Sequence, residues 1–526
     1  LGHDFSEPRL STRGEKACQI EGIVHVDVLK FIRKIFSQEL ELDSYKMDDV
    51  AQELLHEKKH DIDVAFLAQA WDHHPELLEA YCNYNLHDAR LAYRLFEKIF
   101  PNLLEMVKIV GLPMFDINRM AYSQLVEWYI LRQAQRHKEI APNKPSHDEI
   151  RARKAISYPG AFVFQPEPGF YKDIIVYDFK SLYPSIITSH NIGLSNFKCS
   201  CCEGKTKVPF DDDTNYWFCT KKRGFIPSII EELVMRRKRI KEVLLEKKDN
   251  PLLNARQNSL KLLANSFYGY LGFAMARWYC IECSRSITAY ARDYIKQTIQ
   301  KVNEAHFSKV YGDTDSVFFT LNGQPKDHAV TLLQKINDVL PGILELELEG
   351  YYPRGLFVSV KASNLGAKKK YALINEKGFI KVRGFETVRR NWSPVGKRVQ
   401  QEVLNIILIE ENPEKAFNKV REVINELRSG TISKKDVIIT TQLTKEINSY
   451  DSVMPHVAIA QKMLGKNMSV SPGMNISYII TRGSGRLRDR AKLPDEISDG
   501  EYDPEYYINN QVVPAVDKIL EVFGYK

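Results

Sequence analysis

The sequence predicts a mixed α and β fold with several domains, and three observations lead to this prediction. The chain has 526 residues, 44% of them hydrophobic, which is enough to bury several cores. Stretches with the apolar spacing of helices alternate with β-branched and aromatic runs, and no internal repeat is evident. Turn-forming Pro, Asn and Ser residues gather at 141–147, which predicts a domain boundary there.

Charge and cysteine content restrict the class of protein. The formal net charge of +7 and the pI near 8.7 are mild, but basic residues gather in stripes at 236–241, 368–370 and 486–492. Such stripes are typical of phosphate-backbone binding, although each one alone is also typical of a solvated surface. Eight cysteines are too few for a disulfide scaffold, and no apolar run reaches the roughly 18 residues of a membrane span. We therefore expect a cytoplasmic protein without a membrane partner.

Two carboxylates stand two residues apart in a strand-forming run at 310–319. β-branched and aromatic residues flank a short polar centre that contains Gly312, which predicts a hairpin with the acids at its tip. Asp313 and Asp315 would face one side of the ribbon, where their charges repel unless a cation such as Mg²⁺ is shared. For this pattern alone, a solvated Asp-rich turn is the alternative.

A second predicted strand, residues 173–179, also ends near an acid, Asp178. A carboxylate at the mouth of a buried strand is costly unless it is paired or binds a metal, so Asp178 is a candidate third ligand. A helix N-cap is the alternative role. Beyond this acid, the backbone N–H groups of Ser181 and Leu182 can bind a phosphate, and Tyr183 would place a rigid ring near the same pocket.

Residues 228–268 predict two helices joined at 247–251. Asn250 suits the N-cap of the second helix, Pro251 suits its first position, and Gly269 suits the residue past its end. Polar residues share one face of each helix: Arg237 and Lys241 on the first, and Lys261, Asn265 and Tyr268 on the second. The cations of these faces would converge on one anion, for which a triphosphate is the candidate.

The first 133 residues show an extended segment at 23–28, a helical pattern at 75–100 and helical character at 121–133. Tyr84 and Asp88 lie one turn apart on the long helix, a pattern most often due to packing and surface charge. A nuclease is an alternative function if this pair belonged to a complete metal site. However, no Asp-x-Glu strand precedes the pair in the chain.

Three segments together resemble the three polymerase motifs of family B DNA polymerases, in family order: 178–187, 261–269 and 311–316. Residues 368–371 resemble the family's basic motif near the primer terminus. Residues 158–161 resemble its template-binding turn, with Ala161 where a second glycine is usual. The resemblance covers nearly the whole chain and points to archaeal replicative enzymes.

The resemblance implies template-directed addition of deoxynucleotides to a primer 3′-hydroxyl, with two Mg²⁺ ions about 3.5 to 4 Å apart. It also implies a right-hand polymerase with these parts: a partial RNase H-like 3′–5′ exonuclease domain (1–100), a connector (101–141), the palm (142–223 and 274–366), the fingers (224–273) and the thumb (367–526). A non-catalytic polymerase-like DNA-binding subunit is the alternative. Such a subunit would be expected to have lost an acid of the set, yet all three acids are present.

The same resemblance implies roles for individual residues. Asp178 and Asp315 would each bind both metals, the Phe179 carbonyl would be a further ligand, and Asp313 would support them. The triphosphate would be held by Arg237, Lys241, Lys261 and the amides of Ser181 and Leu182. Asn265 and Tyr268 would line the nascent base pair, and Tyr183 would lie under the sugar. The DNA would be contacted by Tyr158, Gly160, Lys368, Lys369, Lys370 and Tyr371.

Tyr84 and Asp88 resemble the family's third exonuclease motif, and residues 1–8 resemble sequence just after the second. The first two motifs would then precede Leu1, so we expect no appreciable exonuclease activity from this chain, because one acid cannot hold two metals. Expected partners are primer–template DNA and deoxynucleoside triphosphates. A sliding clamp and a second chain with the amino-terminal half are further candidates.

The cysteines leave two questions open at this point. Four thiols in a loop-like segment suit zinc by type but lack the spacing of two Cys-x-x-Cys knuckles, so free thiols are favoured: Cys199, Cys201, Cys202 and Cys219. Cys280 and Cys283 resemble a palm pair that is disulfide-bonded in some heat-adapted archaeal relatives. Reduced thiols are the default expectation in a cytosolic protein.

Overall fold

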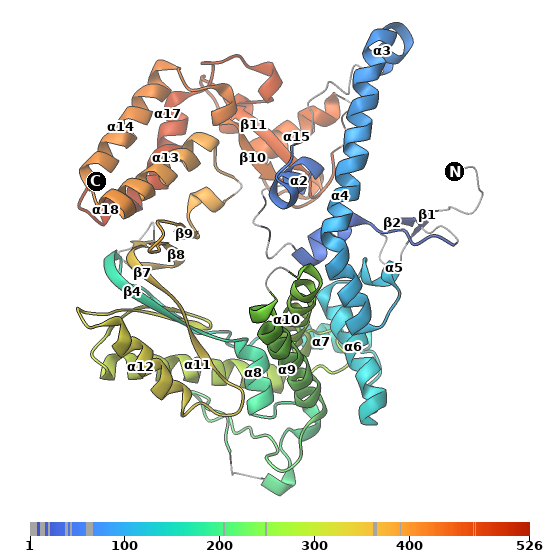
Figure 1. Ribbon diagram of the computed structural model, residues 1–526. Coiled ribbons are helices and arrows are strands. Elements are labelled where there is room, and N and C mark those ends of the chain that lie inside the picture. Colours follow the sequence, from blue (N-terminus) through green and yellow to red (C-terminus); the bar gives the residue numbers. More distant parts are fainter. Residues whose placement is uncertain are drawn as a thin grey trace. The chain divides into compact units, whose positions relative to one another are not determined.

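The computed structural model describes residues 8–10, 16–18, 22–36, 40, 42, 45–58, 67–202, 206–247, 250–360, 365–389, 391–466, 468 and 470–525 (Figure 1). The chain divides into two compact units. Unit 1 comprises residues 1–161, 179–294 and 339–345, and unit 2 comprises residues 162–178, 295–338 and 346–526. The division falls inside several elements, among them the strand that ends in Asp178 and Phe179. The predicted boundaries of palm, fingers, thumb and connector remain predictions.

Unit 1 consists mainly of helices. Its elements are β1 (Pro8–Leu10), β2 (Lys16–Cys18), α1 (Val28–Phe31), α2 (Met47–Leu55), α3 (Leu67–His73), α4 (Leu78–Val110), α5 (Met114–Ile117), α6 (Tyr122–His137), α7 (His147–Lys154), α8 (Leu182–Ser189), α9 (Phe225–Glu246), α10 (Pro251–Leu271) and the first part of α11 (Ile281–Glu304). Helices α4, α6 and α9 pack against α10. No helix in the described part of the chain is long and apolar enough to cross a bilayer.

Helix α4 is longer than the sequence predicts. Its buried residues Leu91, Leu95, Ile99 and Leu103 recur every four positions and form one apolar stripe. The predicted end at residue 100 is wrong, because the stripe continues to Val110 although Pro101 lies inside the helix. A proline removes one intrahelical hydrogen bond, and here burial of the stripe outweighs that loss.

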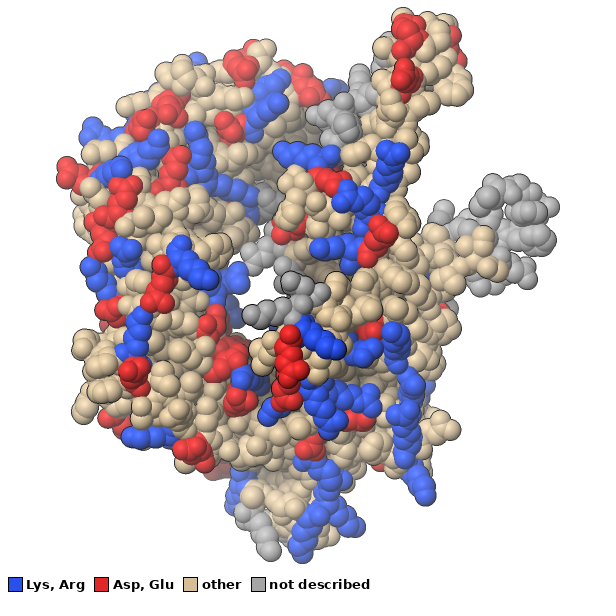
Figure 2. Space-filling view, viewed as in Figure 1, with Lys and Arg blue, Asp and Glu red and all other residues tan. Residues whose placement is uncertain are grey.

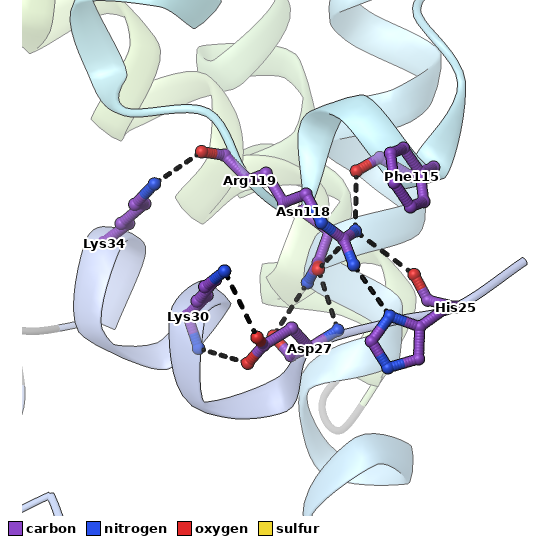
Figure 3. A network of polar contacts seen from close by, with 7 residues as sticks. All are labelled: His25, Asp27, Lys30, Lys34, Phe115, Asn118 and Arg119. Atoms are coloured by element: carbon purple, nitrogen blue, oxygen red, sulfur yellow. Dashed lines mark hydrogen bonds and ion pairs between the residues drawn. The ribbon is translucent and has the colours of Figure 1, made fainter. Parts of the chain in front are cut away.

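The predicted extended segment at 23–28 ends one residue earlier in the structure, at Asp27. Residues 24–27 are irregular and helix α1 begins at Val28, with the Asp27 carboxylate accepting a hydrogen bond of 2.9 Å from the Lys30 N–H. Figure 3 shows what fixes this segment: the Asn118 side chain binds the backbone N–H and C=O of Asp27, at 2.8 and 3.0 Å. The Arg119 guanidinium contacts His25 at 2.7 Å. Polar contacts with a distant segment therefore hold His25 and Asp27 in place just before the helix begins.

The two-helix prediction for 228–268 is confirmed by α9 and α10. The Asn250 side chain accepts a hydrogen bond from the Leu253 N–H at 3.1 Å, and Pro251 occupies the first helical position. The predicted end at Gly269 is wrong, because α10 runs to Leu271 and Gly272 is its cap. The buried residues Tyr270 and Leu271 explain the extra turn, since they extend the apolar face.

Unit 2 is organised by a seven-stranded sheet in the order β3-β5-β6-β4-β7-β8-β9. The strands are β3 (Val163–Phe164), β4 (Gly169–Phe179), β5 (Ser308–Asp313), β6 (Ser316–Thr320), β7 (Leu346–Ser359), β8 (Gly366–Ile374) and β9 (Ile380–Arg383). One face buries an apolar cluster that includes Ile174, Val176 and Phe318. On β4, Tyr177 donates a hydrogen bond of 2.5 Å to the Ala329 carbonyl of α12 (Lys326–Asn337).

The carboxyl-terminal part of unit 2 adds helices and a small second sheet. Its elements are α13 (Pro394–Asn405), α14 (Pro413–Ser429), β10 (Ile439–Gln442), α15 (Pro455–Gly465), β11 (Asn475–Ile480), α16 (Leu487–Arg490), β12 (Ala491–Lys492), α17 (Pro504–Tyr507) and α18 (Val513–Glu521). Strands β10, β11 and β12 form a three-stranded sheet. Residues of β7 and β8, such as Leu356 and Ala372, share one core with α13, α14 and α18. Strands β7 and β8 of the large sheet are thereby packed against these helices.

Candidate active site

Strands β5 and β6 form the predicted hairpin. Their register pairs Asp313 with Ser316, which leaves Thr314 and Asp315 as a two-residue turn. Thr314 adopts a left-handed backbone with φ of 49°, as the first residue of such tight turns does. The prediction of a hairpin with the acids at its tip is confirmed. Because Asp315 lies in the turn itself, the strict alternation of a ribbon does not fix its direction.

Asp178 lies beside this turn. Strand β4 pairs with β6 so that Asp178 is opposite Ser316, and the Ser316 hydroxyl donates a hydrogen bond of 2.7 Å to the Asp178 carboxylate. The alternative role as an N-cap is wrong, because Ser181 holds the N-cap position of α8. Asp178 therefore joins Asp313 and Asp315, which are far from it in sequence, at one end of the sheet in unit 2.

Burial and mutual repulsion make these acids costly to ionise. Burial, together with the charge of Asp315, raises the pKa of Asp178 to about 7. Burial likewise raises the pKa of Asp315 to about 6, with Asp313 adding to the shift. A divalent cation would remove this cost, since carboxylate oxygens are the ligands that hard cations prefer.

Two further acids contribute, and the sequence reasoning missed them. Glu347 and Glu349 lie on β7, next to β4 in the sheet, and both raise the pKa of Asp178. The Glu349 carboxylate also contacts the Lys381 ammonium at 2.5 Å. The alternation of Leu346, Glu347, Leu348 and Glu349 would have predicted a strand with two acids on one face. That these acids face the Asp178 end depends on the strand order, which the alternation does not reveal.

The basic motif on β8 divides into two parts. Lys368 and Lys369 are exposed, and the Lys369 ammonium lies 3.2 Å from the Asp313 carboxylate. The backbone N–H of Lys369, which has φ of 61°, donates a hydrogen bond of 3.0 Å to the Tyr311 hydroxyl. Lys369 is therefore tied to the hairpin and neutralises part of its charge.

Lys370 and Tyr371 point into unit 2. The Lys370 ammonium lies 2.8 Å from the Glu386 carboxylate, and the two side chains are only 15% and 2% exposed. Tyr371 is buried in a cluster of rings with Tyr311 and Phe357. These contacts differ from the predicted DNA contacts, because both side chains have packing partners inside the protein.

In unit 1, a hydrogen-bonded group links α8, α9 and α10. Ser181 adopts a left-handed backbone with φ of 48° immediately before α8, and its hydroxyl accepts a hydrogen bond of 3.1 Å from Arg237 of α9. Arg237 also donates to the Gln257 side chain of α10 at 3.4 Å. Leu182 begins α8, so its N–H belongs to the first turn, where backbone donors lack intrahelical acceptors.

The remaining predicted nucleotide contacts lie on exposed helix faces. Lys241 of α9, and Lys261 and Asn265 of α10, are exposed. Figure 2 shows Lys and Arg side chains gathered over α6 and α9. The exposed face of α10 agrees with the predicted shared face, since Leu260, Leu263, Ala264 and Phe267 are buried.

Three tyrosines of unit 1 form a chain. The rings of Tyr183 and Tyr268 lie 4.3 Å apart between centroids, at 32°. The Tyr268 hydroxyl is 3.1 Å from the Tyr158 hydroxyl. The backbone of the 158–161 turn is fixed by Arg292, which donates to the Pro159 and Gly160 carbonyls at 3.3 and 3.0 Å.

Tyr84 and Asp88 both lie on α4. Among the described residues, the only group of three or more His, Cys, Asp or Glu side chains with ligand atoms within 4.8 Å of one another is Cys199, Cys201, Cys202 and Cys219. Asp88 belongs to no such group, and the three aspartates of unit 2 are spaced more widely than this. Cys280 and Cys283 form a disulfide at the start of α11, so the expectation of reduced thiols there is wrong.

The chain is similar to several known DNA polymerases. The model of DNA polymerase family B matches residues 114–523. The DNA polymerase of Thermococcus gorgonarius is 39% identical over an alignment of 537 positions, which covers 100% of this chain and 67% of that protein. The DNA polymerase of Archaeoglobus fulgidus is 34% identical, covering 96% of this chain and 64% of its own length.

A solved structure of a family B DNA polymerase is also similar to this chain. The family B DNA polymerase of the hyperthermophilic archaeon Pyrobaculum calidifontis aligns with a TM-score of 0.70 and 30% identity, covering 99% of this chain and 66% of that one. The chain thus spans about two thirds of the length of these relatives. The alternative of a non-catalytic subunit is not favoured, since all three acids are present and the relatives are named DNA polymerases. The chain is a DNA-directed DNA polymerase that belongs to family B.

Proposed function

We propose that this chain extends a primer 3′-end on a DNA template with Asp178 and Asp315 as the ligands of two Mg²⁺ ions. The single observation that carries the proposal is the pairing of β4 with the β5–β6 hairpin, which gathers partly buried acids whose ionised forms repel. Such an arrangement fits divalent cations. When bound, Mg²⁺ would acidify the primer 3′-hydroxyl and offset charge on the departing pyrophosphate.

Other charged groups near Asp178 and Asp315 change the net charge of the site. Asp313 supports the ligands from the hairpin, and its contact with Lys369 limits the negative charge there. Glu347 and Glu349 add negative potential from β7. The Phe179 carbonyl, which follows Asp178 directly in β4, is a further proposed ligand.

For the nucleotide, we assign the phosphates to unit 1. Arg237 is held beside Ser181 at the start of α8, where the Ser181 and Leu182 N–H groups favour an anion. Lys241 and Lys261 would add charge from the exposed faces of α9 and α10. Asn265 and Tyr268 would line the base pair, and the Tyr158 and Gly160 turn with Lys368 and Lys369 would contact DNA.

A primer-extension assay tests this function. The purified chain, a labelled primer on a longer template and all four deoxynucleotides should give full-length product only when Mg²⁺ is present. A mismatched nucleotide supplied alone should give little extension, because the template directs addition. A folded chain that never extends the primer, in Mg²⁺ or Mn²⁺, would contradict the proposal.

Replacing Tyr183 with Ala should admit ribonucleotides. The Tyr183 ring is fixed by Tyr268, so it can exclude a 2′-hydroxyl by shape. We expect the preference for deoxynucleotides to fall on the order of 10- to 100-fold, with deoxynucleotide incorporation largely kept. Competition between the two nucleotide types measures the effect, and Tyr183→Phe, which keeps the ring, is the matched control. An unchanged preference in Tyr183→Ala would refute this role.

A further inference from the structure

Four cysteine thiols of unit 1 converge in the segment between α8 and α9. The Cys201 sulfur lies 3.6 Å from that of Cys219 and 3.7 Å from that of Cys202. The Cys202 and Cys219 sulfurs are 3.9 Å apart, and Cys199 completes a group in which all sulfurs lie within 4.8 Å of one another. This cluster has no part in the polymerase site described above.

The sulfur–sulfur distances of 3.6 to 3.9 Å match those of a tetrahedral metal site. A tetrahedral zinc site has Zn–S bonds of about 2.3 Å, which gives sulfur–sulfur edges of about 3.8 Å. A disulfide requires about 2.05 Å between sulfurs, and the four thiols are free, in contrast to Cys280 and Cys283. The sulfurs are thus too far apart to be bonded and are spaced as around a shared ion.

The fold, rather than the sequence spacing, assembles the group. An antiparallel bridge between Phe197 and Phe218 places Cys219 beside the start of the segment. The Cys219 N–H donates to the Asn196 carbonyl at 2.9 Å, and the Trp217 indole donates to the Cys199 carbonyl at 2.9 Å. Cys201 and Cys202 follow on a short 3₁₀ turn, Ser200–Cys202.

Backbone donors point at the sulfurs, as they do around metal-bound thiolates. The Thr220 N–H lies 3.4 Å from the Cys202 sulfur, and the Lys222 N–H lies 3.3 Å from the Cys219 sulfur.

We propose that Cys199, Cys201, Cys202 and Cys219 bind one structural zinc ion. Four sulfur ligands in a closed tetrahedron leave no open position, which is typical of structural rather than catalytic zinc. The flanking Lys198, Lys221 and Lys222 partly offset the two negative charges that zinc leaves on four thiolates.

The zinc ion would order the connection between α8 and α9. Asn191, just after α8, donates to the Cys219 and Lys222 carbonyls at 2.6 and 2.8 Å. Arg223, which precedes α9, donates to the Thr188 carbonyl of α8 at 2.6 Å. A long connection with little regular structure gains order from such a clamp.

Metal analysis of the purified full chain tests the proposal, with plasma mass spectrometry as the readout. We expect about one zinc per chain in the parent and near zero in Cys219→Ser. Cys82→Ser is the matched control, because Cys82 is an exposed free cysteine outside the cluster, and it should keep the zinc. The melting temperature should fall with a zinc chelator in the parent and in Cys82→Ser, but not in Cys219→Ser.

A second measurement tests the proposal on the parent chain, so it remains decisive if the Cys219→Ser variant does not fold. X-ray absorption at the zinc edge of the parent should show four sulfur neighbours at about 2.3 Å. A metal-free parent, a disulfide among these four cysteines in mass spectra, iron in place of zinc, or nitrogen and oxygen neighbours would each overturn the proposal. These outcomes do not depend on polymerase activity.

Discussion

We expect Asp178→Asn to abolish nucleotide addition, with a rate loss on the order of 10³-fold or more, because an amide would not hold the proposed divalent cations as the carboxylate would. The amide can keep the hydrogen bond with Ser316 and removes a buried charge that Asp315 repels. Stability should therefore be equal to or above that of the parent. Asp315→Asn should behave in the same way, since its carboxylate is also buried beside other acids. Single-turnover primer extension measures the rate.

Two controls make this result specific. Asp327→Asn changes an exposed acid of α12 in the same unit and should leave extension unaltered. Mg²⁺ should raise the melting temperature of the parent but not of the double variant Asp178→Asn/Asp315→Asn, because binding stabilises only a protein that keeps the site. Extension within tenfold of the parent for either single variant would show that the acids are not the metal ligands.

Lys370→Met should lower the stability of the folded protein more than it lowers the affinity for DNA. The change leaves the Glu386 carboxylate, which is 2% exposed, without its cation, although the Gln400 amide still donates to it at 2.7 Å. Breaking a buried ion pair from one side costs roughly 3–5 kcal/mol, and the partial exposure of Lys370 puts the expected loss at the lower end. Melting temperature and urea midpoint measure the loss.

The matched control is Lys368→Met, on the same strand. Lys368 is exposed, so its replacement should leave the melting temperature near that of the parent while it weakens DNA binding and reduces the salt dependence of affinity. If Lys370→Met melted like the parent and lost DNA affinity as Lys368→Met does, the phosphate-contact role suggested by the sequence would be restored.

The parts that the sequence predicts well are those with local causes. The hairpin around Asp315 follows from strand-forming residues on both sides of a short polar turn, and the start of α10 follows from the Asn250 cap and Pro251. The prediction that a strand ends near the acid Asp178 is equally local. In each case the deciding contacts lie within a few residues, so the pattern contains the information.

The parts that the sequence does not predict depend on partners far along the chain. The end of α4 is set by burial of a stripe against other helices, and the contacts of His25 and Asp27 are made by Asn118 and Arg119. Glu349 joins the acids only because β7 lies beside β4. Residues 368–370 look like an exposed run of lysines in the sequence. The pattern does not indicate that Lys370 is paired with Glu386.

The order of strands in the large sheet has a consequence for synthesis on the ribosome. Strand β4 lies between β6 and β7, both of which are translated long after it. Until they emerge, the apolar β4 has neither neighbour, and unpaired strands of this kind pair with other chains. Most of unit 2 therefore folds late and through distant contacts, which makes folding slow. Nascent chains should depend on chaperones until the last strands are made, whatever the stability of the finished enzyme.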